Sequence, residues 1–254
     1  MEQIEVGFML EGAEPFNDNN INATWKAHVR THSDTVVAYV KPLPPKEIYI
    51  ECVCAILGRA LNLPIPRPLI IRIAPDLMET LQTHHPLAFG SQDAGHPSFR
   101  RAFDIDQEEA IKRLKQFSKV LDVGVFDEWI ANWDRNIGNI LYDGGSEFLF
   151  IDHGLALSDE LSPDQPAERN QVLSTVVSGV SEFERFKINR EIKTDILPTY
   201  QDISFIMLSD KTKASFYLSE DEITRVINFL QARLTSITRL IALRLQLMQQ
   251  EMVI

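Results

Sequence analysis

The sequence predicts an α+β fold with two lobes, a small β-rich N-terminal lobe that contains one helix and a larger, mainly helical C-terminal lobe. Segments rich in β-branched residues occur at residues 36–41 and 69–73. Apolar residues at helical spacing dominate residues 111–131 and the C-terminal end of the chain. We therefore expect the first lobe to span residues 1–80 and the second to span residues 81–254.

The N-terminal lobe is expected to contain a strand that ends in Lys41 and a helix that follows it. Residues 36–41, Val-Val-Ala-Tyr-Val-Lys, are typical of a strand. Residues 46–61 have apolar side chains at helical spacing after Pro45, which suits the first turn of a helix. Glu51 lies beside this apolar stripe, where a carboxylate is costly to bury unless it is paired. Lys41 is its natural partner.

A second glutamate leaves an alternative open. Glu47 lies one turn before Glu51 on the same side of the expected helix. The helix dipole sufficiently explains an acidic residue in a first turn. We therefore favour Glu51 as the partner of Lys41.

The C-terminal lobe is expected to contain a helix at residues 111–131, which would break near Gly124. This helix leads into the polar segment 132–139. Two short strands are expected at residues 140–142 and 147–151, because these apolar runs flank a Gly-rich turn.

The last helix is expected to begin sharply after Ser219. Ser219 and Glu222 form the capping-box pattern, and apolar residues then recur every three or four positions. Further apolar residues make this helix apolar on more than one side: Leu240, Leu243, Leu247 and Met248. Such a helix is buried within its own chain or binds a protein partner.

The strongest indication of function is the order and spacing of Asp134, Asn139 and Asp152. In residues 132–139, Asn-Trp-Asp-Arg-Asn-Ile-Gly-Asn, Asp134 precedes Asn139 by five positions, and Asp152 follows Asp134 by 18. Protein-kinase catalytic loops contain the same Asp-x-x-x-x-Asn step, in which Asp accepts the proton of the acceptor hydroxyl and Asn holds a metal ion. Asp152 follows an apolar run and precedes His-Gly, much as in the kinase Asp-Phe-Gly motif. With the lysine and glutamate upstream, this order predicts a protein-kinase-like fold.

A magnesium site is expected where these motifs meet. The hairpin between them would place Asp134, Asn139 and Asp152 around one cavity, where neighbouring carboxylates repel each other unless a divalent cation bridges them. The alternative is structural, because Asp, Asn and Gly favour turns in any protein.

These motifs resemble those of the HipA-like kinases, bacterial Ser/Thr kinases related to the phosphoinositide-kinase branch of the kinase fold. The resemblance covers roughly residues 30–155 and rests on these residues: Val40-Lys41, Glu51, Leu-Asn-Leu-Pro-Ile-Pro at 61–66, the segment 132–139, and Ile-Asp-His-Gly at 151–154. It implies ATP and Mg²⁺, with Asp134 as catalytic base, Asn139 and Asp152 on the metal, and Lys41 on the phosphates.

The chain also departs from that family. Asn136 stands where many members have His, a change that should be tolerable if the side chain only orients the loop. A Gly-x-Gly-x-x-Gly phosphate loop is absent, since only Gly7 and Gly12 precede Lys41. Backbone N–H groups of residues 11–20 are the expected substitute.

Two polar segments have competing interpretations. Residues 90–98, which include Ser91 and Ser98, indicate a flexible loop. Members of the resembled family can autophosphorylate a serine in a mobile loop. A Gly/Ser/Pro-rich connector needs no such role, and this is the interpretation that we favour. Residues 158–170, rich in Asp, Glu and Pro, stand in the place of a kinase activation loop.

Composition agrees with a cytoplasmic enzyme of ordinary globular character. The chain of 254 residues has no run of 18 apolar residues, and its acidic start lacks the apolar core of a secretory signal. Cys52 and Cys54 would lie on different sides of a helix, which suits neither a disulfide nor a metal site.

Charge argues against nucleic acid and membrane partners. The formal net charge is −11, and phosphate binding needs a concentrated basic surface. The densest basic stretch, Arg100-Arg101 with Lys112, Arg113 and Lys115, is interleaved with acidic residues and indicates a solvated helix face.

The sequence therefore predicts an ATP-dependent phosphotransferase, a HipA-like protein serine/threonine kinase that uses Mg-ATP. Its expected partners are ATP, a protein acceptor, and an antitoxin-like or other protein that binds the C-terminal helix. One alternative is a kinase of an inositol lipid or another small-molecule hydroxyl. The other is a nucleotide-binding pseudokinase that acts as a scaffold, which the missing Gly-rich loop favours.

Overall fold

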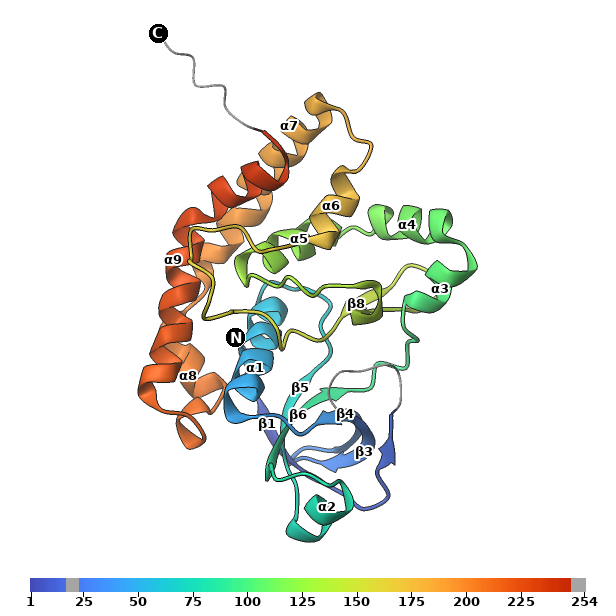
Figure 1. Ribbon diagram of the computed structural model, residues 1–254, viewed down its shortest axis with the longest axis vertical. Coiled ribbons are helices and arrows are strands. Elements are labelled where there is room, and N and C mark those ends of the chain that lie inside the picture. The colour runs from blue at the N-terminus through green and yellow to red at the C-terminus, as the bar shows by residue number, and fades with distance from the viewer. Residues whose placement is uncertain (17–22, 248–254) are drawn as a thin grey trace. The chain divides into compact units, whose positions relative to one another are not determined.

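The computed structural model describes residues 1–16 and 23–247, and the chain forms two compact units (Figure 1). The first unit consists of residues 1–97, 149–154 and 205–223, and the second comprises the rest of the described chain. The prediction that helices and strands are mixed is confirmed. The functional division at residue 80 stays a prediction.

Six strands of the first unit form one sheet in the order β1-β5-β6-β4-β3-β2. Their bounds are Glu5–Met9 (β1), Glu14–Pro15 (β2), Trp25–Arg30 (β3), Thr35–Lys41 (β4), Pro68–Arg72 (β5) and Leu87–Gln92 (β6). Strand β1 pairs in parallel with β5 and antiparallel with β3. The second pairing closes five strands into a small barrel, which removes the exposed edges of the sheet.

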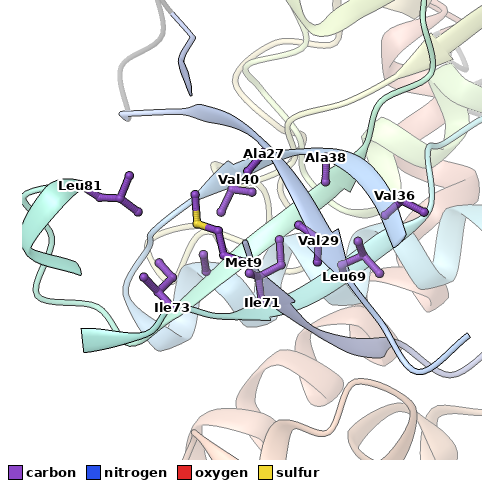
Figure 2. Packing of buried hydrophobic residues seen from close by; sticks show 11 residues of the cluster. Met9, Ala27, Val29, Val36, Ala38, Val40, Leu69, Ile71, Ile73 and Leu81 are labelled. Atoms are coloured by element: carbon purple, nitrogen blue, oxygen red, sulfur yellow. The ribbon is translucent and has the colours of Figure 1, made fainter. Parts of the chain in front are cut away.

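Apolar side chains from every strand of the ring form the interior of the first unit (Figure 2). On β4, the buried residues Val36, Ala38 and Val40 alternate with less buried ones, as expected when one face of a strand lines a core. Lys41 follows Val40, so its side chain leaves the opposite face of the strand.

Helix α1 (Pro45–Ala60) packs against β5 and β6 (Figure 1). Pro45 occupies its first turn, as predicted, and every residue from 48 to 58 is buried. A second, unexpected helix, α2 (Pro75–Thr80), lies in the same part of the chain. The prediction of one helix is therefore wrong, because Leu77 and Met78 pack against the barrel core.

Shorter elements complete the first unit. They are η4 (Phe205–Met207), α8 (Leu208–Lys211) and η5 (Ala214–Phe216). The N–H of Ile4 donates to the carbonyl of Lys211, and the N–H of Phe150 donates to the carbonyl of Pro64, both over 2.9 Å. These bonds attach segments that are distant in sequence to the barrel and its helix.

The second unit is mainly helical. Its elements are α3 (Arg100–Ile105), α4 (Gln107–Gln116), α5 (Val120–Trp129), η1 (Ile137–Asn139), β7 (Ile140–Tyr142), α6 (Gln171–Val177), α7 (Glu182–Glu191), the π-helix η2 (Ile192–Ile196), η3 (Leu197–Asp202) and most of α9 (Glu220–Arg244). Strand β7 pairs with β8 (Phe148–Phe150), as the two apolar runs predict.

The predicted helix at residues 111–131 is two helices, and the break lies at residues 117–119. The expectation of a break at Gly124 is wrong. Gly124 lies inside α5, where a Cβ atom would come within 2.7 Å of the side chain of Leu173 on α6. The glycine therefore serves close helix packing.

Helix α9 begins with the predicted capping box. Ser219 Oγ accepts from the N–H of Glu222, whose carboxylate accepts from the N–H of Ser219. Leu240 is fully buried, whereas Leu243 is 41% exposed, so much of the wide apolar surface packs within the chain. Met248 lies outside the described residues.

The polar segment 90–98 is not a loop throughout. Residues 90–92 belong to β6, where Ser91 pairs with Pro68 on one side and Tyr39 on the other. The ladders of two neighbouring strands override the polar composition. In residues 1–16 and 23–247, no helix combines the length and apolar character needed to cross a bilayer.

Gly90 provides a test of the barrel packing. A Cβ atom there would overlap Ile71 Cδ1 and approach Leu69 Cβ to 3.3 Å. We expect Gly90→Ala to cost about 1–3 kcal/mol in free energy of unfolding. Ile71→Val, which removes Cδ1, should cost about 0.5–1.5 kcal/mol alone. In the double variant the cost should fall below the sum, because the overlap is relieved. Urea unfolding measures this, and additive costs would contradict the packing.

Candidate functional site

The first unit brings together Lys41, Glu51, Asp152 and His153. Lys41 Nζ at the end of β4 lies 2.8 Å from Asp152 Oδ1 and 3.6 Å from Glu51 Oε1 on α1. The side chains of Lys41 and Asp152 are 15% and 34% exposed, whereas that of Glu51 is 1% exposed. The ion pair thus extends from the buried face of α1 to a partly open carboxylate.

His153 completes the surroundings of Glu51. Its backbone N–H donates to Glu51 Oε2 over 2.9 Å, and its Nδ1 lies 3.7 Å from the same oxygen. One carboxylate oxygen of Glu51 therefore faces Lys41 and the other faces His153, which is itself buried. His153 is not among the residues predicted from the sequence, although it directly follows Asp152.

The Lys41–Glu51 pair is held in its ionised form. Burial alone would raise the pKa of Glu51, but the Lys41 ammonium and the hydrogen bond from His153 bring that pKa below its usual range. Burial likewise opposes the charge of Lys41, and the two carboxylates raise its pKa. Glu47, the alternative partner, has no ion pair among the described residues.

The backbone at Asp152 is strained for a residue other than glycine, with φ of 62°. This left-handed conformation follows directly after β8 and Ile151. It belongs to the turn from which the Asp152 carboxylate reaches Lys41. Backbone strain of this kind concentrates at functional sites.

The predicted catalytic loop lies in the second unit, directly after α5. Asn139 Nδ2 donates to the carbonyl oxygen of Asp134 over 2.9 Å and to Asp134 Oδ2 over 3.3 Å. Asn136 donates to the same carbonyl and accepts from the N–H of Gly138. The side chain of Asn136 thus bonds only backbone groups of its own loop, which is the condition under which the change from His should be tolerable.

A buried ion pair attaches this loop to α5. Arg135 Nε and Nη2 donate to both carboxylate oxygens of Asp127, each over 3.0 Å, and Nη1 donates to the carbonyl of Asn139. Both side chains are 1% exposed, and Asn132 also donates to Asp127. Asp127 is not among the residues predicted from the sequence, although a carboxylate inside a largely apolar helix indicates a buried partner.

A second buried carboxylate holds the segment that follows. Glu128 accepts from Arg233 and Arg244 of α9 and from Asn170 Nδ2. Arg233 also donates to the carbonyls of Pro163 and Gln165. Residues 163–170 are therefore tied to α5 and α9 by residues that are distant in sequence.

Asn139 and Asp152, each considered within its own unit, keep an oxygen atom of the kind that hard cations bind. Asn139 uses its amide nitrogen within the loop, and among the described residues no hydrogen bond engages its Oδ1. Asp152 Oδ2 is likewise unused within that part of the chain. Amide and carboxylate oxygens are the ligands that Mg²⁺ prefers. Across the described ranges, no three His, Cys, Asp or Glu side chains form a metal-binding group.

The expected substitute for a phosphate loop is described only in part. Gly7 lies in β1, where a Cβ atom would overlap Val29, so this glycine serves the barrel. Gly12 adopts φ of 84° between β1 and β2. Of residues 11–20, those from 17 onward lie outside the described chain.

Comparisons with known proteins match the chain to a family model and to solved structures. The family model of HipA-like kinases matches residues 26–182, more than half of the chain and a range that contains all the predicted site residues. The crystal structure of the Helicobacter pylori proinflammatory kinase CtkA has a similar fold, with a TM-score of 0.54 and 13% identity over 93% of this chain and 95% of that one. No curated protein matches.

The ionised state of Glu51 predicts an acid-dependent stability. Because the folded pKa lies below the ordinary value of about 4.5, ionised Glu51 stabilises the fold above about pH 4.5, and this contribution is lost as the pH falls further. We expect Glu51→Gln to cost about 2–4 kcal/mol at pH 7. Its difference from the wild type should shrink below about pH 4.5.

Unfolding free energies at pH 7, 5, 4 and 3 measure this difference. Glu47→Gln is the matched control, and it should cost only about 0.3–1 kcal/mol through the helix dipole. A cost of Glu51→Gln that stays constant through this range would mean that Glu51 is not held as a carboxylate.

Proposed function

Because the chain belongs to the family of HipA-like kinases, we propose that it transfers the γ-phosphoryl group of ATP to a Ser or Thr hydroxyl of a protein. The observation that carries this proposal is the set of ion pairs and hydrogen bonds in which Lys41 meets Glu51 and Asp152, and Asp134 meets Asn139. The Lys41–Glu51 ion pair is the one that a protein kinase needs in place for phosphoryl transfer, and Asp134, Asn139 and Asp152 are of the residue types that kinases use as base and metal ligands.

Lys41 is proposed to hold the phosphates of ATP. Its ammonium already lies between two carboxylates, and Glu51 is fixed on α1 by burial and by the N–H of His153. Glu51 is therefore a positioning residue that keeps Lys41 extended and charged. A positioned cation stabilises the charge that accumulates on the transferred group.

Asp134 is proposed as the catalytic base. In the reaction, the acceptor oxygen forms a bond to the γ-phosphorus while the bond to the bridging oxygen of ADP breaks, and the hydroxyl proton passes to the Asp134 carboxylate. Asn139 and Arg135 keep the loop in place through the bonds described above. The chain itself thus contributes position and charge rather than covalent chemistry.

Asn139 Oδ1 and Asp152 are proposed to hold magnesium. When bound, the ion would neutralise charge on the phosphate oxygens. The two side chains belong to separate units, and the donor chemistry of each supports this assignment.

Further parts of the proposal concern organisation. We propose that residues 1–80 and 81–254 act as the two lobes of the kinase and that backbone N–H groups of residues 11–20 cover the phosphates. The enzyme would act in the cytoplasm, with a protein acceptor and an antitoxin-like or other partner.

Labelled ATP tests the function directly. We expect the wild type with Mg²⁺ to transfer label to Ser or Thr, and Asp134→Asn to lower turnover by about 10²-fold or more. ATP affinity should stay within a few-fold, because Asp134 contacts the acceptor rather than ATP. Label on a lipid or small molecule would move the chain to another acceptor class, and no transfer with intact ATP binding would indicate a pseudokinase.

Thermal stabilisation by ATP provides the binding control. It should require Mg²⁺ and should largely vanish in Asp152→Ala, because ligand-induced stability follows site occupancy. Lys41→Met should weaken it as well. If, in the labelling experiment, Asp134→Asn turned over at the wild-type rate, another residue would have to be the catalytic base.

A further inference from the structure

An arginine lies directly against the proposed catalytic loop. Helix α3 contacts η1, and Arg100 is its first residue. A Cβ atom on Gly138 would come within 3.0 Å of Arg100 Nη2 and 2.9 Å of Asn136 Oδ1. The guanidinium therefore covers Gly138, one residue before Asn139, and the glycine leaves the space that it occupies.

The backbone that carries Arg100 is firmly anchored. Phe99 is 1% exposed, and its N–H donates to the carbonyl of Ile140 over 2.8 Å. Its ring meets those of Tyr142 and Phe148 edge to face, with centroids 5.7 and 5.5 Å apart. Ser98 also forms a bridge to Leu141. Ser98 and Phe99, which precede Arg100, are thus bonded to β7, the strand that follows the catalytic loop. This anchoring fixes the position of the Arg100 backbone.

The charge of Arg100 is uncompensated. Arg100 is exposed, and within the described chain it takes part in no ion pair. Arg113 and Lys112, from the same basic stretch of sequence, both pair with Glu109. The solvated-face interpretation thus suits α4, whereas Arg100 is a free cation beside the loop of a protein with a net charge of −11.

We propose that Arg100 selects acceptors with an acidic residue close to the phosphorylated Ser or Thr, and the substrate class is therefore an acidic protein segment. This inference rests on the proposed function. A guanidinium presents a planar fork of donors that matches a carboxylate in two parallel hydrogen bonds. Because Arg100 contacts the loop that contains Asp134 and Asn139, an acceptor hydroxyl at Asp134 would bring its neighbouring side chains to this cation.

The test is a positional library of Ser peptides in which each position flanking the serine is fixed in turn as Glu, Gln or Lys. For the wild type we expect kcat/KM to be about three- to tenfold higher with Glu than with Gln at one or more positions close to the serine. Arg100→Gln should remove this preference, and Arg100→Glu should shift it to Lys. Arg100→Lys should restore part of it, because the charge remains without the fork.

Arg101→Gln is the matched control. Arg101 is exposed and adjacent, and among the described residues its side chain takes part in no hydrogen bond or ion pair. The Arg101→Gln variant should keep the wild-type preference for Glu over Gln in the peptide. A merely structural Arg100 would lower turnover on Glu and Gln peptides alike and leave their ratio unchanged.

The outcomes separate the two proposals. An unchanged Glu/Gln ratio in Arg100→Gln overturns the inference alone, as does a rise in KM for ATP with the peptide preference intact. Failure of the wild type to phosphorylate any library member overturns the Ser/Thr function on which the inference rests.

Discussion

The buried carboxylate of Glu51 is the constraint on which the proposed nucleotide-binding group depends. An ionised carboxylate that is 1% exposed persists only if its environment compensates the lost hydration. Lys41 and the N–H of His153 supply that compensation from β4 and from the turn after β8. Satisfying Glu51 therefore fixes the lysine, and the same turn presents Asp152 to it. The proposed function and the fold therefore require the same geometry here.

In the second unit, two further buried carboxylates are each compensated by an arginine. Asp127 and Glu128, adjacent on α5, are both buried, and each is paired with arginine. Asp127 holds Arg135 and hence the loop around Asp134, whereas Glu128 holds Arg233 and the segment that precedes α6. Breaking such a pair leaves an uncompensated charge in a buried site. The Asp127–Arg135 pair therefore holds the loop around Asp134 in addition to the hydrogen bonds within the loop.

The parts of this structure that the sequence predicts well are those set by local pattern. The strand that ends in Lys41, helix α1, the β7–β8 hairpin and the Ser219 capping box all follow from periodicity and cap chemistry. The missed features depend on distant partners. Gly124 is explained only by Leu173, the strand at Ser91 only by its two neighbours, and the roles of Asp127 and Glu128 only by their arginines. The Lys41–Asp152 contact was likewise beyond a linear pattern, because it requires the turn at Asp152.

A double-mutant cycle on kcat tests the central claim, that Glu51 acts through Lys41. If the two residues form one unit, Lys41→Ala and Glu51→Ala each remove the same interaction, and the double variant should lose little more than the worse single variant. Glu47→Ala should leave kcat close to the wild-type value. Additive losses at Lys41 and Glu51, or a larger loss at Glu47, would contradict the account.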